Sequence, residues 1–238
     1  MHYWRGIKEA LEANHTKVYS AKVPPSGSIE ARAAALLQFI KANLQGEKVN
    51  LIAHSMGGID ARYLLSKGLK DQSFQVMSLT TIASPHRGSS FADYCIHEIG
   101  PSGLPRLYAL LHRIGLDTEA FEQLTTYAMA DFNKVIPDAP GVKYFSYGAT
   151  AKPPLWSFFR GSHAIVKERE GDNDGLVSVE SSKWGEYRGT LTDVHHLDLI
   201  NWTNKIRFKW GEITGQPRKF SAVAFYLSIV DMLAKKGL

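Results

Sequence analysis

The 238-residue sequence has little of several features that mark particular classes of protein. Cys95 is its single cysteine, so no disulfide can form within the chain, and we expect a small buried apolar residue there. No apolar run approaches the roughly 20 residues that span a bilayer, and the first residues lack the apolar core of a secretory signal. No H-E-x-x-H or comparable histidine spacing occurs, which argues against zinc catalysis and predicts no metal. Together these absences favour an intracellular globular protein.

Charge is also unremarkable in its distribution. Lysine and arginine exceed aspartate and glutamate by 28 to 23, which gives a net charge of +5 and a pI of about 9.2. The basic residues are dispersed and no nucleic-acid motif accompanies them, so no nucleic-acid partner is expected. A weak, salt-sensitive attraction to anionic lipid is the most that this charge predicts.

The most informative stretch is Val49–Gly58, in which an apolar run ends at Ser55 and a helical pattern begins at once. A serine on a tight strand-to-helix turn is the nucleophile elbow of the α/β-hydrolases. We expect strained backbone angles at Ser55 and small residues two positions before and after it, which Ala53 and Gly57 supply. The N-terminus of the following helix then points at the reaction centre, so the Met56 N–H is the predicted oxyanion donor.

Strand and helix patterns alternate along the chain, which predicts a single α/β domain over 1–238, with a mostly parallel sheet flanked by helices. The predicted strands are Thr16–Ala21, the run before Ser55, Phe74–Ala83, Val142–Ala149 and Thr190–Val194. The predicted helices are Tyr3–Asn14, Ser28–Leu44, the segment from the elbow to Ser66, Leu197–Phe208 and Phe220–Lys235.

A helical insertion is expected at about 101–137, where the sheet pattern stops. One helical face there carries Leu104, Leu107, Tyr108, Leu111 and Ile114, and a second helical segment covers 118–135. Two interpretations remain open, a pair of helices fixed on the body or a movable lid whose apolar face covers the site and turns to lipid. On the second, Leu107 and Leu111 would contact substrate.

Chain order restricts the partners of Ser55, because an α/β-hydrolase places the acid after the serine and the histidine last. Asp174, in the turn sequence Asn173-Asp174-Gly175, is the preferred acid and Asp172 its rival. The base must follow the last strand, where His195 and His196 stand, and His196 is preferred. His86 lies near the predicted active edge, where it would shape the substrate pocket, and His54 is expected to point to the other side of the elbow.

Four segments in this order carry a family resemblance: Ala53–Gly58, Thr80–Ser89, Asn173–Val177 and His196–Asp198. Over nearly the whole chain the sequence resembles the triacylglycerol lipases of the α/β-hydrolase superfamily, in particular a mostly fungal, intracellular branch related to the bacterial true lipases. The resemblance implies Ser55 as nucleophile, Asp174 as acid and His196 as base. Asp198 matches one ligand of a structural calcium in the bacterial relatives, but no second carboxylate is evident before Asp174, which does not favour calcium.

The resemblance also implies an upstream strand and a His-Gly loop carrying a second oxyanion donor, which this sequence lacks. The leading hypothesis is a serine ester hydrolase acting on acylglycerols, with peripheral contact with a lipid surface as a further expectation. The alternatives are a short-chain esterase or acyltransferase with the same triad, or a catalytically impaired lipid-binding relative. A mitochondrial or lipid-droplet location is conceivable for such a family, and the sequence does not specify an oligomeric state.

Overall fold

The computed structural model describes residues 3–25, 27–68, 74–99, 118–155, 157–202 and 220–238. The elements in these ranges are α1 (Ile7–Ala13), α2 (Ile29–Asn43), β1 (Lys48–His54), α3 (Met56–Lys67), β2 (Gln75–Ile82), α4 (Ser90–His97), α6 (Thr118–Glu122), α7 (Thr126–Val135), β3 (Lys143–Thr150), α8 (Arg160–Arg169), α9 (Val179–Ser182), β4 (Glu186–Thr192), a 3₁₀ helix η1 (Asp198–Ile200) and α11 (Ala222–Lys235). No helix among these residues is long and apolar enough to cross a membrane.

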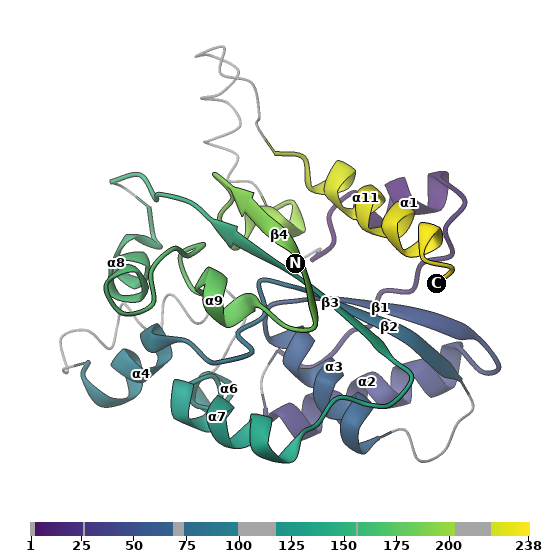
Figure 1. Cartoon of the computed structure of the whole chain (residues 1–238), viewed down its shortest axis with the longest axis horizontal. Coiled ribbons are helices and arrows are strands. Elements are labelled where there is room, and N and C mark those ends of the chain that lie inside the picture. Colours follow the sequence, from purple (N-terminus) through teal and green to yellow (C-terminus); the bar gives the residue numbers. More distant parts are fainter. Residues whose placement is uncertain (1–2, 26, 69–73, 100–117, 156, 203–219) are drawn as a thin grey trace, which may run out of the picture.

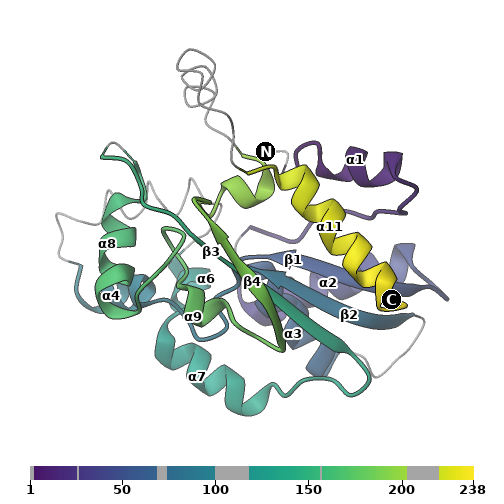
Figure 2. The ribbon, with the colours of Figure 1, turned by 45° about the horizontal axis from the view of Figure 1, so that its top comes forward.

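The four described strands form one parallel sheet in the order β1-β2-β3-β4. Helices α1 and α11 lie on one side of it and α2 and α3 on the other, while α4, α6, α7, α8 and α9 gather near one end of the strands (Figures 1 and 2). The inner strand β2 is buried along most of its length because helices cover both of its faces. The architecture is therefore the α/β-hydrolase type of sheet and helix layers that the sequence predicts.

Two core clusters hold the helix layers to the sheet. On one side Ile7 of α1 and Ile229 of α11 pack with Ile82 and Phe145 of the strands. On the other side the core residues come from α2, α3, β2 and β3, among them Ile40, Leu64, Leu79 and Tyr144. Helix α2 begins where its cap predicts, because the Ser28 hydroxyl accepts a hydrogen bond from the Ala31 N–H.

The predicted strand at Thr16–Ala21 is wrong, since this segment has no regular secondary structure. A strand needs a ladder partner, and no described strand pairs with β1 on the side away from β2. The segment and β1 instead both line a cavity of about 1470 Å³. The composition of a segment does not show whether its backbone groups find partners in a neighbouring strand, and this is why the prediction fails here.

Other boundaries also differ from the predicted ones. β4 begins at Glu186, four residues before the predicted start. The predicted helix from Leu197 is only a 3₁₀ turn at Asp198–Ile200, because Asn201 and Trp202 are not helical, and its remaining part, 203–208, lies outside the described residues. The predicted helical segment 118–135 is two helices, α6 and α7, separated by a break that ends at the N-cap residue Thr125.

A buried ion pair joins α2 to α3. The Arg32 guanidinium donates to both carboxylate oxygens of Asp60 at 2.8–3.1 Å and also to the Pro24 carbonyl. The two side chains are only 7% and 1% exposed, so each charge depends on the other for compensation. Burial raises the pKa of Asp60 to about 6, although Arg32 opposes the shift.

Replacement of Asp60 by asparagine is therefore expected to lower the free energy of unfolding at pH 8 by about 3–5 kcal/mol, because Arg32 keeps its charge without a counter-ion. Urea denaturation measures the change. Asp231, whose carboxylate pairs with Lys235 on the surface of α11, offers a matched control, and its replacement by asparagine should cost about 1 kcal/mol or less. Equal losses from the two variants would show that the buried pair contributes no more than a surface pair.

Candidate active site

Ser55 lies between β1 and α3 in the strained conformation expected of an elbow. Its φ is +55° and its ψ −135°, values that a non-glycine residue rarely adopts. The Ser55 N–H donates to the Ile82 carbonyl at 3.0 Å, which ties the turn to the end of β2. The hydroxyl is thus presented at the carboxyl ends of two neighbouring parallel strands, where α/β sheets place their ligands.

The close packing around the elbow falls one residue later than expected. A Cβ on Gly57 would meet only the Ala53 Cβ at 3.9 Å, an ordinary contact. A Cβ on Gly58 would lie 2.8 Å from the Ser84 Cβ and 2.9 Å from the Thr81 Cγ2. Gly58, rather than Gly57, lets α3 pack directly against the end of β2.

We expect Gly58→Ala to lower the free energy of unfolding by about 1–3 kcal/mol, because the added methyl group must displace Ser84 or Thr81. Gly57→Ala adds the same methyl group to the same helix with space available, so its effect should stay within about 1 kcal/mol of the wild-type value. Chemical denaturation of the two variants side by side tests the assignment. A larger loss for Gly57→Ala would contradict it.

The three side chains selected from chain order meet at this edge. The His196 Nε2 lies 2.9 Å from the Ser55 Oγ, and the His196 Nδ1 lies 2.7 Å from the Asp174 Oδ2. Asp174 is fully buried and His196 is 3% exposed. With Asp174 accepting from Nδ1, the His196 Nε2 is left as the acceptor for the Ser55 hydroxyl proton.

Asp174 is held by its own loop. Its Oδ1 accepts hydrogen bonds from the Leu176 and Val177 N–H groups at 3.0 and 2.9 Å, and its carbonyl accepts one from the His196 N–H. The two donors to Oδ1 fix the orientation of the carboxylate and leave Oδ2 for His196. The short turn therefore does two things, since it fixes the acid and places the backbone of the histidine beside it.

The rival residues lie elsewhere. The Asp172 carboxylate is exposed and pairs with the Lys167 ammonium at 2.6 Å, and this hydrogen bond lowers the pKa of Asp172. The His195 N–H donates to the Asp198 Oδ2 at 3.1 Å, at the start of η1, while the His195 ring makes neither of the contacts that His196 makes with Ser55 and Asp174. The structure thus brings together Ser55, Asp174 and His196, the set preferred from sequence.

Met56 is the first residue of α3, so its N–H belongs to the first turn, whose donors have no partner within the helix. Its side chain is buried in the core cluster under the site, beside Ile59. The backbone direction of α3 thus presents the Met56 N–H and the positive end of the helix dipole next to Ser55. This is the position that an oxyanion donor requires.

His86 does not line the cavity that reaches Ser55. It is fully buried, with its Nε2 2.9 Å from the Thr81 hydroxyl and its ring stacked on Trp184. Burial lowers the pKa of His86 well below its ordinary value, and the nearby Arg62 lowers it further. Its observed contacts support the loop after β2 rather than a substrate. Leu107 and Leu111, the other two predicted contacts, lie outside the described residues.

The described part of the predicted insertion is packed on the body of the protein. Phe121 and Leu124 are buried in the same cluster as Met56. The Asp93 carboxylate of α4 accepts hydrogen bonds from the N–H and the hydroxyl of Thr126, at the start of α7. These contacts attach the described part of the insertion to the body, and the choice between a fixed helix pair and a movable lid stays a prediction.

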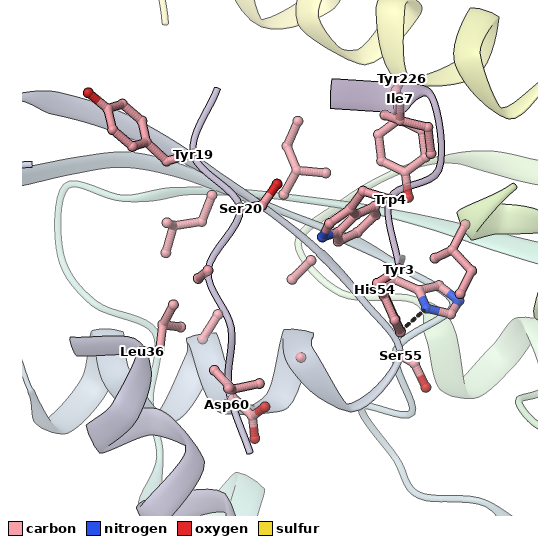
Figure 3. A pocket seen from close by; sticks show the side chains of 18 of the residues that line it. Tyr3, Trp4, Ile7, Tyr19, Ser20, Leu36, His54, Ser55, Asp60 and Tyr226 are labelled. Atoms are coloured by element: carbon pink, nitrogen blue, oxygen red, sulfur yellow. Dashed lines mark hydrogen bonds between the residues drawn. The ribbon is translucent and has the colours of Figure 1, made fainter. Parts of the chain in front are cut away.

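The cavity beside β1 reaches the site, and Ser55, Met56 and His196 are among its lining residues. Figure 3 shows this cavity from close by, with Ser55 at the end of β1 and Trp4, Ile7 and Tyr226 on the side of α1 and α11. Near Ser55 the wall includes the apolar side chains of Phe121, Leu124 and Leu176. The arrangement offers an apolar space next to the serine hydroxyl.

His54 and Tyr3 were missed as parts of the site. The prediction that His54 points to the other side of the elbow is wrong, because its ring centroid lies 4.5 Å from that of His196. The Tyr3 hydroxyl lies 2.7 Å from the His54 Nδ1 (Figure 3). The two residues are 51 positions apart, so no local sequence pattern reveals their contact. They meet because the segment that leads into α1 packs against the sheet.

The calcium site that the resemblance raised stays an untested expectation. Asp198 uses its carboxylate to accept from the His195 backbone, and no group of three or more potential His, Cys, Asp or Glu ligands occurs in the described ranges. No step of the chemistry below involves a metal.

A parallel sheet, a serine at a strained strand-to-helix turn, and an aspartate and a histidine later in the chain define the α/β-hydrolase class. Comparisons narrow the class. Residues 30–109 match the family described as "Putative serine esterase (DUF676)". Triacylglycerol lipase 2 of Saccharomyces cerevisiae is 43% identical over 247 residues, which cover 99% of this chain and 74% of that protein. The triacylglycerol lipase of Vibrio cholerae is 30% identical, over 84% of this chain and 74% of its own.

Solved structures agree on the fold. The Staphylococcus hyicus lipase superposes with a TM-score of 0.72 at 18% identity, over 98% of this chain and 90% of its own. The Bacillus licheniformis lipase BlEst2 superposes with a TM-score of 0.65 at 21% identity, and the match covers 86% of this chain and 83% of that lipase. This chain belongs to the triacylglycerol lipase family and is a serine ester hydrolase.

Proposed function

We propose that the chain hydrolyses the ester bonds of acylglycerols, with Ser55 as nucleophile, His196 as base and Asp174 as the acid that orients it. The observation that carries the proposal is the continuous hydrogen-bonded series from the Ser55 hydroxyl through His196 to the buried Asp174. A serine hydroxyl becomes a competent nucleophile only when such a base takes its proton.

In the first half-reaction the Ser55 Oγ attacks the ester carbonyl carbon while the His196 Nε2 takes the hydroxyl proton. The negative charge that develops on the carbonyl oxygen is stabilised by the Met56 N–H at the N-terminus of α3. His196 then gives the proton to the departing glycerol oxygen, and the carbon–oxygen bond breaks to leave an acyl-serine. Water attacks this ester with His196 again as base, which releases the fatty acid and restores the Ser55 hydroxyl.

An acylglycerol substrate is supported by the surroundings of Ser55 and by the relatives. The apolar wall at Phe121, Leu124 and Leu176 suits the chain of a fatty acid better than a polar acyl group. The relatives of highest identity named above are triacylglycerol lipases. Peripheral contact with a lipid surface stays a prediction. So does an intracellular location at mitochondria or lipid droplets.

The test is release of fatty acid from an emulsified long-chain triacylglycerol, followed by titration at constant pH, beside hydrolysis of the water-soluble p-nitrophenyl acetate. An acylglycerol hydrolase releases acid from the emulsion and cleaves the soluble ester. Cleavage of p-nitrophenyl acetate without release from the emulsion would identify a short-chain esterase instead. Failure of both substrates would contradict the proposal.

A further inference from the structure

One buried titratable side chain next to the site has no part in the mechanism above. His54 is 4% exposed, precedes Ser55 directly, and its ring is tilted by 45° against that of His196. Its Nδ1 shares a hydrogen bond of 2.7 Å with the Tyr3 hydroxyl. Its Nε2 is buried and makes no hydrogen bond among the described residues, although the His196 backbone lies close to it.

These contacts determine the protonation state of the pair. Burial is the main cause that lowers the pKa of His54 well below its ordinary value, and the neighbouring His196 ring lowers it further. The His54 ring is therefore neutral, with one nitrogen protonated and the other not. The Tyr3 side chain is 39% exposed overall, but desolvation of its hydroxyl, which meets the His54 Nδ1, raises the pKa of Tyr3, so the hydroxyl keeps its proton.

Two tautomers of His54 are available, and the surroundings favour one. If Tyr3 donates to Nδ1, the proton of His54 sits on Nε2, and the His196 backbone, whose contact acts to raise the pKa of His54 as an acceptor does, is available to it. If Tyr3 accepts instead, Nε2 is a bare lone pair buried next to that backbone, and a buried acceptor without a donor is costly. The Nε2–H tautomer is therefore the favoured one.

We propose that Tyr3 and His54 form a positioning pair for the general base, in which the Tyr3 hydroxyl holds the neutral His54 ring against His196 so that Nε2 of His196 stays aligned with the Ser55 hydroxyl. This inference rests on the proposed function of Ser55 and His196. Tyr3 and His54 are positioning residues, because the atoms that react are those of Ser55, His196 and the ester.

The His54 ring supports a part of His196 that the hydrogen bonds of the triad do not hold. Asp174 holds His196 at Nδ1 and the Ser55 hydroxyl meets its Nε2, and both contacts lie at the edge of the ring, so packing must support its faces. His54 supplies that face at a centroid distance of 4.5 Å. Tyr3 lines the cavity, and the 2.7 Å hydrogen bond from its hydroxyl to Nδ1 fixes the His54 ring from the cavity side.

The first test is steady-state hydrolysis of p-nitrophenyl butyrate by Tyr3→Phe, His54→Phe and the double variant. Each single variant keeps an aromatic ring and is expected to lower kcat by about 10-fold with KM changed by less than about 2-fold, since misalignment of the base affects the chemical step. The double variant should lose about the same 10-fold, because both substitutions break one linked interaction. Additive losses of about 100-fold would overturn the proposal.

A matched control exists at the surface of the protein. The Tyr127 hydroxyl lies 2.9 Å from the His97 Nε2, so Tyr127→Phe removes a tyrosine–histidine hydrogen bond away from the site. It should leave kcat at the wild-type value. Thermal unfolding of every variant separates positioning from stability, and a loss of kcat that simply follows the loss of Tm, or a Tyr3→Phe variant with wild-type kcat, would overturn the proposal.

The second test does not depend on turnover. Imidazole ¹⁵N NMR of the full chain should show His54 with a protonated Nε2 and an unprotonated Nδ1, and Tyr3→Phe should shift the Nδ1 signal of His54 and the ring signals of His196. A protonated Nδ1 in the wild-type chain would overturn the proposal. If the wild-type chain fails to cleave any ester while these signals are as expected, the proposed function fails and the pairing of Tyr3, His54 and His196 stands.

Discussion

Replacement of Ser55 by alanine is expected to reduce kcat for ester hydrolysis by about a million-fold, with little change in the affinity for substrate. The hydroxyl is the only group at the elbow that can form the acyl intermediate, and its Oγ lies 2.9 Å from the base. The alanine removes no apolar contact of the cavity wall, so binding should persist. Hydrolysis of p-nitrophenyl butyrate under saturating conditions measures the loss.

Ser66 provides the control for this substitution, because it lies near the other end of α3, and Ser66→Ala should leave kcat within about 2-fold of wild type. Circular dichroism of both variants checks that the fold is kept. A Ser55→Ala variant that retained more than a few per cent of the wild-type kcat would place the nucleophile elsewhere and contradict the mechanism.

Asp174→Asn is expected to lower kcat by about ten-thousand-fold while KM changes little. Asparagine keeps the size of the side chain, but its amide can donate to the His196 Nδ1. The ring then adopts the tautomer with its proton on Nε2, which cannot accept the proton of Ser55. The loss of the carboxylate also removes the charge that stabilises the imidazolium during the reaction.

The matched control is Asp172→Asn, two residues earlier in the same loop. Asp172 is exposed and pairs only with Lys167 among the contacts described here, so its replacement should alter kcat by less than about 2-fold. A reversed result, with the large loss at Asp172, would make the rival aspartate the acid. Equal effects would show that neither residue has the separate role that the geometry gives to Asp174.

Much of the site could be predicted from the sequence because its elements are local and ordered. The elbow needs a strand, a serine and a helix in succession, and β1, Ser55 and α3 follow each other without a gap. Asp174 and His196 could be selected because the order of strands in an α/β sheet limits which loops reach the serine. Asp174 could be preferred over Asp172 because it lies in an Asn-Asp-Gly sequence, which is typical of a tight turn. In the structure the N–H groups of that turn donate to the Asp174 carboxylate.

What could not be predicted depends on contacts between distant parts of the chain. The pairing of Tyr3 with His54 arises only when α1 packs beside the sheet, and the packing at Gly58 depends on Ser84, 26 positions away. The false strand at 16–21 has the same cause, since strand propensity does not show whether a neighbour is available. His86 was predicted to line the substrate pocket because it follows the strand β2. Its burial against Thr81 and Trp184 depends on tertiary packing, which the sequence does not show.

The most direct test of the central claim is the reaction of the full chain with diethyl p-nitrophenyl phosphate, followed by mass spectrometry of the intact protein and its peptides. This reagent captures a serine only when a base activates it. We expect one diethylphosphoryl group per chain, located on Ser55, absent from Ser55→Ala and formed far more slowly in His196→Ala. A wild-type chain that takes up no phosphoryl group, or takes it up at a residue other than Ser55, would contradict the account.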